Sequence, residues 1–547
     1  MNARRTRPAA WLVFLLLSTA ASAQPQAGHP ALAGHAIVLD AQGKLLSWVQ
    51  PQDRAYAEVA RLAFSYLLER MPVEANGLPT IYTYCCFDGS TLRGTGWPHN
   101  PVAVNAGLAL GASAYYRYSG DERVVRLAGA LLTHHILNGS TPAGWDWSAV
   151  PYASSDHGAV RYRGAFDFAY DRQNPGRGDG YGVIEPDKLG EAGVAYLEFW
   201  KLTGQPQYRD AALACARALA HHVRTGDGER SPWPFRVYAE TGIVREEYCA
   251  NVAPALRLFD ELRRLSLGEQ ADFERARGLA YEWMMAHPAK DDSWANYFED
   301  IPWQAKPSNL NQYDALEAAR YLLETGGPGA LEAARHAVEW TERTFGGDLE
   351  KEKEKGVQWG AIAISEQLGY MYKMGSHTSR FGSVQALLAE KTGDAVAKDK
   401  AFRSLNWASY MCDERGVVRV GPVEPSIWFS DGYADYVRHF MAGMASVPEW
   451  TPRAESHLLR TSSTVKTVSY SPARVAFSSF DDEGTAVLRL AFVPSAVLAG
   501  GAPLPASGDL SSPGWSFDPA TGVLRLRYAG THAVEVRGGP GTTLKRR

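Results

Sequence analysis

Apolar residues recur at helical spacing along most of the chain, and the same arrangement returns several times. Each copy has one helix that is apolar or aromatic nearly all round, a turn at glycine, and a second helix with an apolar stripe on one side and charges on the other. The copies cover residues 106–137, 189–222, 251–268, 313–327 and 381–394. A helix that is apolar all round is buried, whereas a striped helix lies on the outside. The pattern therefore predicts alternating inner and outer helices.

Two further helices complete this pattern. Residues 52–71 supply an outer helix before the first copy and residues 431–444 an inner helix after the last, so the helices form six outer–inner pairs. Such pairs could stack as an open solenoid. However, the copies differ in length, and long loops rich in Trp, Gly and Pro precede inner helices at 139–186 and 287–310. Long irregular connections in a compact domain are usually functional. We expect a mainly α protein with a closed (α/α)6 toroid over residues 52–460.

Beyond the toroid the spacing changes from helical to alternating. Short runs in which apolar and polar residues alternate cover residues 464–470, 474–479, 485–492, 522–527 and 532–536. Such runs, separated by Gly, Pro and Asp, predict strands. Residues 461–547 are expected to form a small antiparallel β domain with a long loop at 493–515. In the N-terminal segment 24–51, residues 37–48 predict a β-hairpin, and residues 357–374 have a helical appearance.

The first 23 residues have the features of a secretory signal peptide. Three arginines precede an apolar run at residues 9–17, and Ala-Ser-Ala follows at residues 21–23. The run is too short to cross about 30 Å of hydrocarbon, and no cysteine follows the cleavage site to take a lipid. We expect cleavage after Ala23, no membrane anchor, and a secreted or periplasmic protein.

The composition excludes several classes of protein. The chain of 547 residues has a net charge of −4 with both signs mixed along it, so it lacks the basic footprint of a nucleic-acid-binding protein. Its five cysteines are odd in number and show no C-x-x-C spacing, which indicates neither a disulfide framework nor a zinc module. No phosphate-cradling glycine loop, nucleotide fingerprint or His-Glu-x-x-His helix occurs. We expect no cofactor and no metal, and the sequence leaves the oligomeric state open.

The predicted arrangement resembles the six-hairpin glycosidase superfamily and the related toroidal polysaccharide lyases and sugar epimerases. The resemblance covers residues 52–450 and depends on the periodicity and on turns such as Trp200-Lys-Leu-Thr-Gly204 and Glu390-Lys-Thr-Gly-Asp394. It is a likeness of fold, and a fold alone does not determine a function. It implies that the loops entering the inner helices line one end of a central cavity, and that the substrate is a carbohydrate.

Four carboxylates stand beside the predicted starts of inner helices. They are Glu185, Asp187, Asp314 and Asp431. Hydrolysis of a glycosidic bond needs one carboxylic acid that protonates the leaving oxygen and a second carboxylate on the other side. The leading hypothesis is therefore a glycoside hydrolase that draws its acid and base from these four, with Asp314 as the first candidate. Capping is the alternative for each of the four, because an acidic residue before a helix is commonly an N-cap.

A polysaccharide lyase or uronate epimerase needs other groups: a Tyr or His base, and Asn, Arg or His to stabilise the charge that develops. The candidates are His99, Asn100, Asn311, Tyr313, His377 and Arg380. A hydrogen-bonded structural role is the alternative for each histidine. Indole rings pack against sugar faces, and the predicted substrate-binding loops carry Trp97, Trp303 and Trp428. A carbohydrate-binding protein without catalysis is a third hypothesis.

Overall fold

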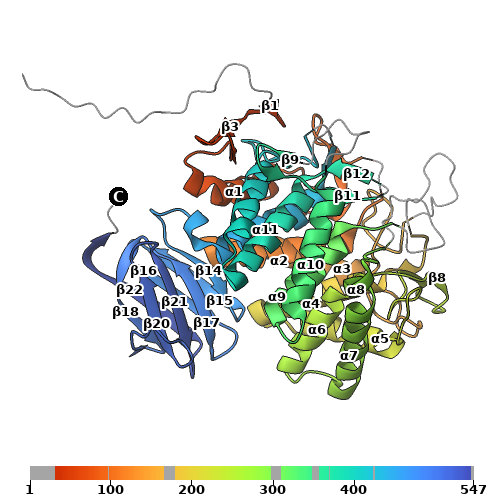
Figure 1. Ribbon diagram of the computed structural model, residues 1–547. Helices are drawn as coiled ribbons and strands as arrows, with labels where there is room; N and C mark the ends of the chain where they lie inside the picture. The colour runs from red at the N-terminus through yellow and green to blue at the C-terminus, as the bar shows by residue number, and fades with distance from the viewer. Residues whose placement is uncertain are drawn as a thin grey trace, which may run out of the picture.

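A ring of helices forms the larger part of the molecule (Figure 1). The computed structural model describes residues 31–95, 98–165, 179–296, 309–347, 357–368, 370–422 and 426–543. The inner helices are α2 (Pro101–Ser119), α4 (Pro186–Thr203), α6 (Ala253–Arg264), α9 (Gln312–Thr325), α11 (Gly375–Thr392) and α13 (Val437–Ser446). The outer helices are α1 (Ala55–Glu69), α3 (Glu122–Asn138), α5 (Pro206–His222), α7 (Gln270–Ala286), α10 (Ala330–Phe345) and α12 (Ala395–Ser409). Inner and outer helices alternate along the chain, as predicted.

The inner helices close into a ring. Each contacts the next in the order α2, α4, α6, α9, α11 and α13, and α13 returns to α2. The molecule is thus a closed (α/α)6 toroid rather than an open solenoid. Small residues permit this close packing: a Cβ on Gly190 of α4 would lie 2.5 Å from the backbone nitrogen of Ala255 on α6. Only glycine lets two helix backbones approach so closely.

The glycine turns of the sequence pattern are helix ends. Gly120, Gly204 and Gly393 follow α2, α4 and α11 with φ of 76°, 73° and 74°. Glycine adopts this left-handed conformation without steric cost, and its N–H then satisfies a carbonyl of the last helical turn. The same turn therefore directs the chain from three inner helices to the outer helices that follow them.

The C-terminal strands form two packed antiparallel sheets. One sheet has the order β14 (His457–Thr461), β17 (Gly484–Arg489), β21 (Val523–Tyr528) and β20 (Gly514–Asp518). The other has the order β15 (Val465–Ser471), β16 (Arg474–Ser479), β22 (Ala533–Thr543), β18 (Phe492–Ala499) and β19 (Ala502–Pro503). Apolar side chains of both sheets, among them Val475, Phe477 and Leu524, form a separate core. This is the predicted small β domain.

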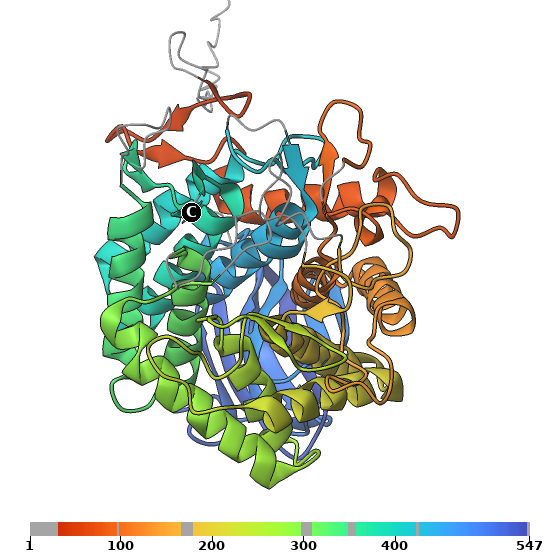
Figure 2. The same cartoon turned by 90° about the vertical axis from the view of Figure 1, so that its right-hand side faces the viewer.

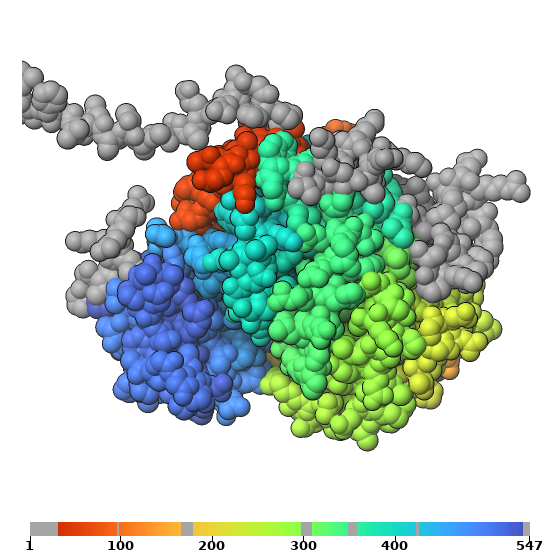
Figure 3. Space-filling model, in the orientation of Figure 1, coloured from red at the N-terminus to blue at the C-terminus, as the bar shows by residue number. Residues whose placement is uncertain are grey.

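The β domain covers one end of the ring. Thr464 donates a hydrogen bond of 2.6 Å to Glu198 near the C-terminus of α4, and Arg264 at the end of α6 pairs with Asp481 at 2.9 Å. Figure 2 looks along the ring, with the blue strands behind its centre, and Figure 3 shows the blue domain packed against the helical body. Since these contacts lie at the C-terminal ends of inner helices, the cavity between the inner helices opens at their N-terminal ends.

Two predictions about local structure were wrong. The stretch predicted as helical contains β9 (Val357–Gln358), β10 (Ala361–Ile362), β11 (Ser365–Gln367) and β12 (Tyr370–Lys373). Trp359 and Gly360 have φ of 50° and 79° and form a two-residue hairpin turn that breaks a helix. The predicted loop at 493–515 contains most of β18, because Pro494 sits at a register irregularity where its missing N–H is tolerated.

The N-terminal hairpin prediction is confirmed, since β3 (Val38–Leu39) pairs antiparallel with β4 (Leu45–Leu46). Within the part of the chain that the structure describes, no helix is long and apolar enough to cross a membrane.

Candidate active site

A cavity of about 800 Å³ lies among the N-terminal halves of the inner helices. Two of its walls repeat the same spacing. On α9 the lining residues are Tyr313, Glu317 and Arg320, and on the π-helical turn Ser430–Tyr436 and the start of α13 they are Asp431, Asp435 and Arg438. Positions separated by three or four residues share one helix face. Each wall therefore presents a column of polar side chains that runs from the mouth of the cavity towards its floor.

Glu191 of α4 is fixed through one carboxylate oxygen. Its Oε1 accepts hydrogen bonds from the Tyr313 hydroxyl at 2.8 Å and the Asn251 amide at 3.2 Å, and Lys188 Nζ lies 3.4 Å away. None of the described residues donates to Oε2, although Glu191 lines the cavity. Burial alone would lower the pKa of Lys188, but the carboxylates of Glu191 and Asp187 hold that pKa well above its usual value. A permanent ammonium therefore lies beside a carboxylate that keeps one oxygen open.

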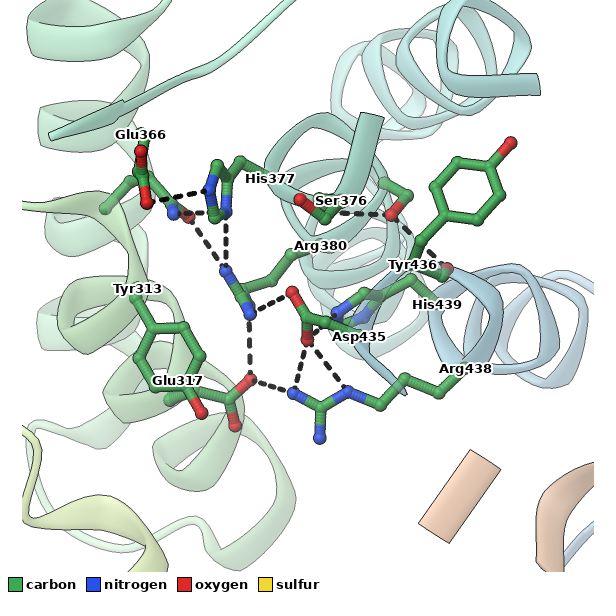
Figure 4. A network of polar contacts seen from close by, with 12 residues as sticks. Tyr313, Glu317, Glu366, Ser376, His377, Arg380, Asp435, Tyr436, Arg438 and His439 are labelled. Carbon is green, nitrogen blue, oxygen red and sulfur yellow. Dashed lines mark hydrogen bonds and ion pairs between the residues drawn. The ribbon is translucent and has the colours of Figure 1, made fainter. Parts of the chain in front are cut away.

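Deeper in the cavity, two carboxylates and two guanidinium groups form a ring of ion pairs (Figure 4). Arg438 lies 2.7 Å from Asp435 and 3.4 Å from Glu317, and Arg380 contacts both carboxylates as well. Burial would raise the pKa of both carboxyl groups, but the surrounding arginines lower that of Glu317 to about 2 and hold that of Asp435 well below its ordinary value. Both groups are therefore ionised at neutral pH and cannot act as acids.

His377 of α11 is a neutral imidazole whose tautomer follows from its neighbours. Its Nδ1 lies 2.7 Å from the Gln312 side-chain nitrogen and 3.1 Å from Arg380 Nη1. Because a guanidinium can only donate, Nδ1 must accept and the proton must sit on Nε2. Burial, reinforced by the charge of Arg380, lowers the pKa of His377 to about 3. The residue therefore stays neutral at physiological pH, with its Nε2 3.9 Å from Glu366.

Comparison with known proteins identifies the fold. No family model and no curated protein matches the sequence. Among solved structures, cellobiose 2-epimerase from Spirochaeta thermophila DSM 6192 is 13% identical with a TM-score of 0.51, and the match covers 73% of this chain and 98% of that one. D-mannose isomerase is 10% identical with a TM-score of 0.50, over 73% and 99% of the two chains. The chain shares the fold of these structures, an (α/α)6 toroid. At these identities the likeness concerns the fold alone.

Seven residues predicted from the sequence line the cavity of this six-hairpin toroid. They are Asn100, Glu185, Tyr313, His377, Arg380, Trp428 and Asp431. Four other predicted residues are not among the described residues that line it: His99, Asp187, Asn311 and Asp314. Trp97 and Trp303 lie outside the described residues. The toroid thus brings two of the four predicted carboxylates, Glu185 and Asp431, to the cavity.

Asp314, the first candidate for catalysis, is buried behind the cavity wall as part of a helix cap. Asn311 is the N-cap of α9, and its side chain accepts a hydrogen bond of 3.1 Å from the Asp314 backbone N–H. The Asp314 carboxyl group in turn lies within 3.4 Å of the side chains of Asn311 and Asn296. Burial raises its pKa to about 8. Asp187 is also buried, with a raised pKa and a hydrogen bond of 3.0 Å from Asn251.

Glu185 reaches the cavity from the end of β6 (Val183–Ile184), which pairs with β7 (Arg236–Tyr238) and through it with β8 (Val244–Glu246). This sheet brings the buried guanidinium of Arg236 to 3.2 Å from Glu185, 2.6 Å from Asp179 and 3.0 Å from Glu246. Glu185 is therefore one of three carboxylates that share one cation.

Asp431 enters the cavity from a π-helical turn, Ser430–Tyr436, which precedes α13. Turns of this kind are rare and frequently occur at functional sites. Trp428 lies at the end of β13 (Ser426–Trp428), which pairs with β5 (Cys86–Asp88) near the mouth. His99, in contrast, packs behind α2 at 5.6 Å from the ring of Tyr162, and burial lowers its pKa to about 3.

Reasoning from the sequence missed eight charged residues of the cavity. They are Lys188, Glu191, Arg257, Glu317, Arg320, Glu366, Asp435 and Arg438. The search was confined to the loops before the inner helices, whereas seven of these residues lie within helical turns of the inner ring and Glu366 lies on β11. The sequence did contain a sign of these residues, because charged residues on helices that are otherwise interpreted as buried require partners or a ligand.

Proposed function

We propose that this six-hairpin toroid is a carbohydrate-active enzyme that removes a proton from a carbon atom of a sugar in the central cavity, as an epimerase, isomerase or lyase does. A cavity of about 800 Å³ is within the usual size range of small-molecule sites. Aromatic and hydrogen-bonding groups line it together, as sugar faces and hydroxyls require. The two solved structures compared above are named for epimerisation and isomerisation of sugars, which is consistent with the proposal.

The observation that carries the proposal is that Glu191 and His377 line the same cavity, each held in place by hydrogen bonds to one of its two polar atoms. Three donors orient Glu191 through Oε1, so Oε2 is placed to accept a proton from the substrate. His377 holds its proton on Nε2, which is buried beside Glu366 at 3.9 Å. In the proposed complex the substrate oxygen on which negative charge develops displaces the Glu366 side chain and accepts a hydrogen bond from this Nε2. A neutral imidazole is suited to this role because its N–H polarises a carbonyl without adding a charge to the site. The proposed base, Glu191, and the proposed donor, His377, are connected through Tyr313 and Arg380. The Tyr313 hydroxyl contacts Glu191 and its ring lies 4.1 Å from Arg380, which in turn contacts His377.

In the proposed step, a C–H bond next to a carbonyl or carboxylate breaks, its proton moves to Glu191 Oε2, and its electron pair passes to the substrate oxygen. Return of a proton from the other face gives an epimer, return to the neighbouring carbon gives an isomer, and loss of a leaving group gives an unsaturated sugar. The Tyr313 hydroxyl, beside Glu191, is a second proton source. It stays protonated because burial, reinforced by the charge of Glu191, holds its pKa well above the ordinary value.

Hydrolysis, the leading hypothesis from the sequence, fits this geometry less well. A glycosidase needs a carboxylic acid that remains protonated beside the leaving oxygen. In this cavity Glu317 and Asp435 are held ionised by arginines. The carboxyl groups with raised pKa values, Asp187 and Asp314, are not among the described residues that line it. The groups best placed for chemistry are a carboxylate, a neutral imidazole and a phenol.

A product assay tests the proposal. The purified mature chain is incubated with neutral and uronate-containing saccharides, and epimers, ketoses, unsaturated uronates and new reducing ends are followed in the same samples. We expect an epimer, a ketose or an unsaturated uronate. New reducing ends with none of these products would establish hydrolysis and contradict the proposal. Sugar binding without any product would indicate the third hypothesis, a binding protein.

We further propose that the enzyme acts outside the cytoplasm. Residues 1–23, whose sequence is typical of a signal peptide, lie outside the described residues. The test is N-terminal sequencing of the protein from fractionated cells that express the whole chain. A mature protein in the periplasm or medium that begins after Ala23 is expected, and a cytoplasmic protein that retains Met1 would contradict the proposal.

A further inference from the structure

Three guanidinium groups gather at the floor of the cavity. Arg257 of α6, Arg320 of α9 and Arg438 of α13 all line it. With a rise of 1.5 Å per residue, Arg320 lies about 10 Å further along its helix axis than Tyr313. Leu110 of α2 and Val194 of α4, which also line the cavity, are apolar. The polar groups of the floor are therefore mainly cationic.

The positive charges of the floor exceed the negative charges beside them. Arg380 and Arg438 share the carboxylates of Glu317 and Asp435, so these four charges cancel. Arg257 pairs with Glu324. Arg320 has no carboxylate within 4.0 Å among the described residues. His439, beside Arg320, is neutral, since burial lowers its pKa to about 3. One positive charge is therefore uncompensated.

Unused hydrogen-bond donors accompany this charge. Arg320 donates through Nη2 to Ser383 at 2.5 Å and lies 3.4 Å from His439 Nδ1. Its Nε and Nη1 have no acceptor among the residues that the structure describes. Nη2 of Arg257 is buried and also lacks an acceptor there. Burial, together with the charges of Arg257 and Arg438, lowers the pKa of Arg320 despite the opposing effect of Glu317 and Glu324. An anion at this position would relieve the repulsion among the arginines and accept hydrogen bonds from their free N–H groups.

We propose that Arg257, Arg320 and Arg438 form a subsite for the carboxylate of an acidic sugar, a uronate, at the floor of the cavity. This inference depends on the proposed function in taking the cavity as the substrate site, and it names the substrate class. The carboxylates Glu185, Glu191 and Asp431 lie nearer the mouth, on the first turns of their helices or just before them. The substrate therefore enters with its carboxylate first and leaves its uncharged end towards the mouth.

A carboxylate fits this subsite better than a phosphate or sulfate ester does. The floor has one uncompensated positive charge, which a monoanion neutralises. A phosphate dianion would leave a net negative charge in a closed, largely desolvated end of the cavity, which is costly. Arginine is also well suited to planar carboxylates. A sulfate monoester carries one charge too, but it is tetrahedral, so the experiment must distinguish it.

Isothermal titration calorimetry of the full mature chain tests the subsite. The probes are glucuronate and galacturonate, glucose and galactose as neutral counterparts, and inorganic sulfate and phosphate at equal ionic strength. We expect the uronates to bind roughly ten- to hundredfold more tightly than the neutral sugars, the range that one charged hydrogen-bonded contact supplies. Arg320→Gln should remove this preference but retain neutral-sugar binding, and Arg320→Lys should keep part of it. The matched control is Arg335→Gln, which removes a positive charge from the outer helix α10.

Equal binding of acidic and neutral sugars by the parent chain would overturn the inference. A preference that survives Arg320→Gln would overturn it as well. Sulfate or phosphate binding stronger than uronate binding would overturn the assignment to a carboxylate. Repeating the titration with Glu191→Gln shows whether uronate binding depends on the proposed base, and so separates this inference from the proposed function. Uronate binding that depends on Arg320, with no product from the parent chain, would contradict the function and leave the subsite intact. Turnover of neutral sugars without a uronate preference would overturn the subsite and leave the proposed function intact.

Discussion

Two polar layers of the cavity differ in how completely their groups are paired. The upper layer comprises Lys188, Glu191, Tyr313 and His377, and the ion-pair layer comprises Glu317, Arg380, Asp435 and Arg438. In the upper layer Glu191 Oε2 and His377 Nε2 have no hydrogen-bond partner among the described residues. In the ion-pair layer both carboxylates contact both guanidinium groups. We infer that the upper layer reacts with substrate, whereas the ion-pair layer supports it and, through Arg438, contributes to the proposed carboxylate subsite.

The contact between the layers is Arg380. It belongs to the ion pairs through Asp435 and Glu317, and its Nη1 donates to Nδ1 of His377 (Figure 4). The ion-pair layer therefore determines which nitrogen of His377 carries the proton. Supporting groups that orient a catalytic side chain in this way commonly affect activity without contacting the substrate.

The largest effect is expected for Glu191→Gln. The amide keeps the shape of the side chain but cannot accept a proton from the substrate. Loss of a general base costs about 10²–10⁴ in rate, so we expect kcat to fall by that factor while the melting temperature stays within a few degrees. Steady-state kinetics and thermal unfolding measure both. A variant with parental activity would place the base elsewhere in the cavity.

Asp435→Asn tests the supporting layer. Removing one partner of a buried ion-pair network leaves charge uncompensated, which typically costs about 3–5 kcal/mol, and it frees Arg380 from its position beside His377. We expect a large loss of stability by chemical denaturation and an altered pH profile of kcat. The control is Glu342→Gln, which removes one partner of the more exposed pair with Lys400 at 2.7 Å. That change should cost about 1 kcal/mol or less, and equal losses for the two variants would contradict the account.

Acidic pH should destabilise the toroid. Burial lowers the pKa of His99, His135, His377 and His439 to about 3, whereas histidine in the unfolded chain titrates near 6.5. Between these values the unfolded chain binds protons that the folded chain cannot, so stability falls as the pH decreases below about 6.5. Thermal unfolding at pH 7.5, 6 and 5 measures the trend. An unchanged melting temperature over this range would show that the buried histidines are charged in the folded state.

The smallest effect is expected for Asp314→Asn. With a pKa of about 8 the Asp314 carboxyl group is mostly protonated at neutral pH, so an amide can replace it beside Asn296 and Asn311. We expect activity within about twofold of the parent and a stability change of about 1 kcal/mol or less, as for other conservative changes. Activity assays beside those of Glu191→Gln compare two carboxyl-to-amide changes directly. A loss as large as that of Glu191→Gln would restore Asp314 as the catalytic candidate.

Much of the fold could be predicted from the sequence, because helical periodicity records which faces are buried. The contrast between helices such as α11, whose residues Gly375–Ala389 are all buried, and striped helices such as α10 predicted the ring. The short strands between Val357 and Lys373 escaped prediction, since strands of two to four residues carry too little pattern to distinguish them from a helix. The strand around Pro494 was missed because a proline is tolerated there only at an irregularity of the strand pairing, which the sequence does not show.

The candidate site was predicted less completely, for a physical reason. Loop residues such as Glu185 and Asp431 could be predicted to line the cavity, because the position before an inner helix marks the mouth of a toroid. Glu191 escaped because its importance depends on Tyr313, which is distant in the sequence and meets it only across the cavity. The raised pKa of Asp314 likewise arises from burial. Pairing and burial across the ring, rather than local pattern, distinguish a carboxylate that faces the cavity, such as Glu191, from a buried one beside a helix cap, such as Asp314.

The most direct test of proton abstraction by Glu191 is deuterium incorporation from D₂O. The parent chain and Glu191→Gln are incubated in D₂O with uronates and neutral sugars, and carbon-bound deuterium in recovered substrate and product is measured by NMR and mass spectrometry. The account predicts deuterium at one carbon next to a carbonyl or carboxylate with the parent chain, and a loss of about 10²–10⁴ in its rate with Glu191→Gln. Turnover by the parent chain without carbon-bound deuterium in product or recovered substrate, or with equal incorporation by the variant, would contradict it.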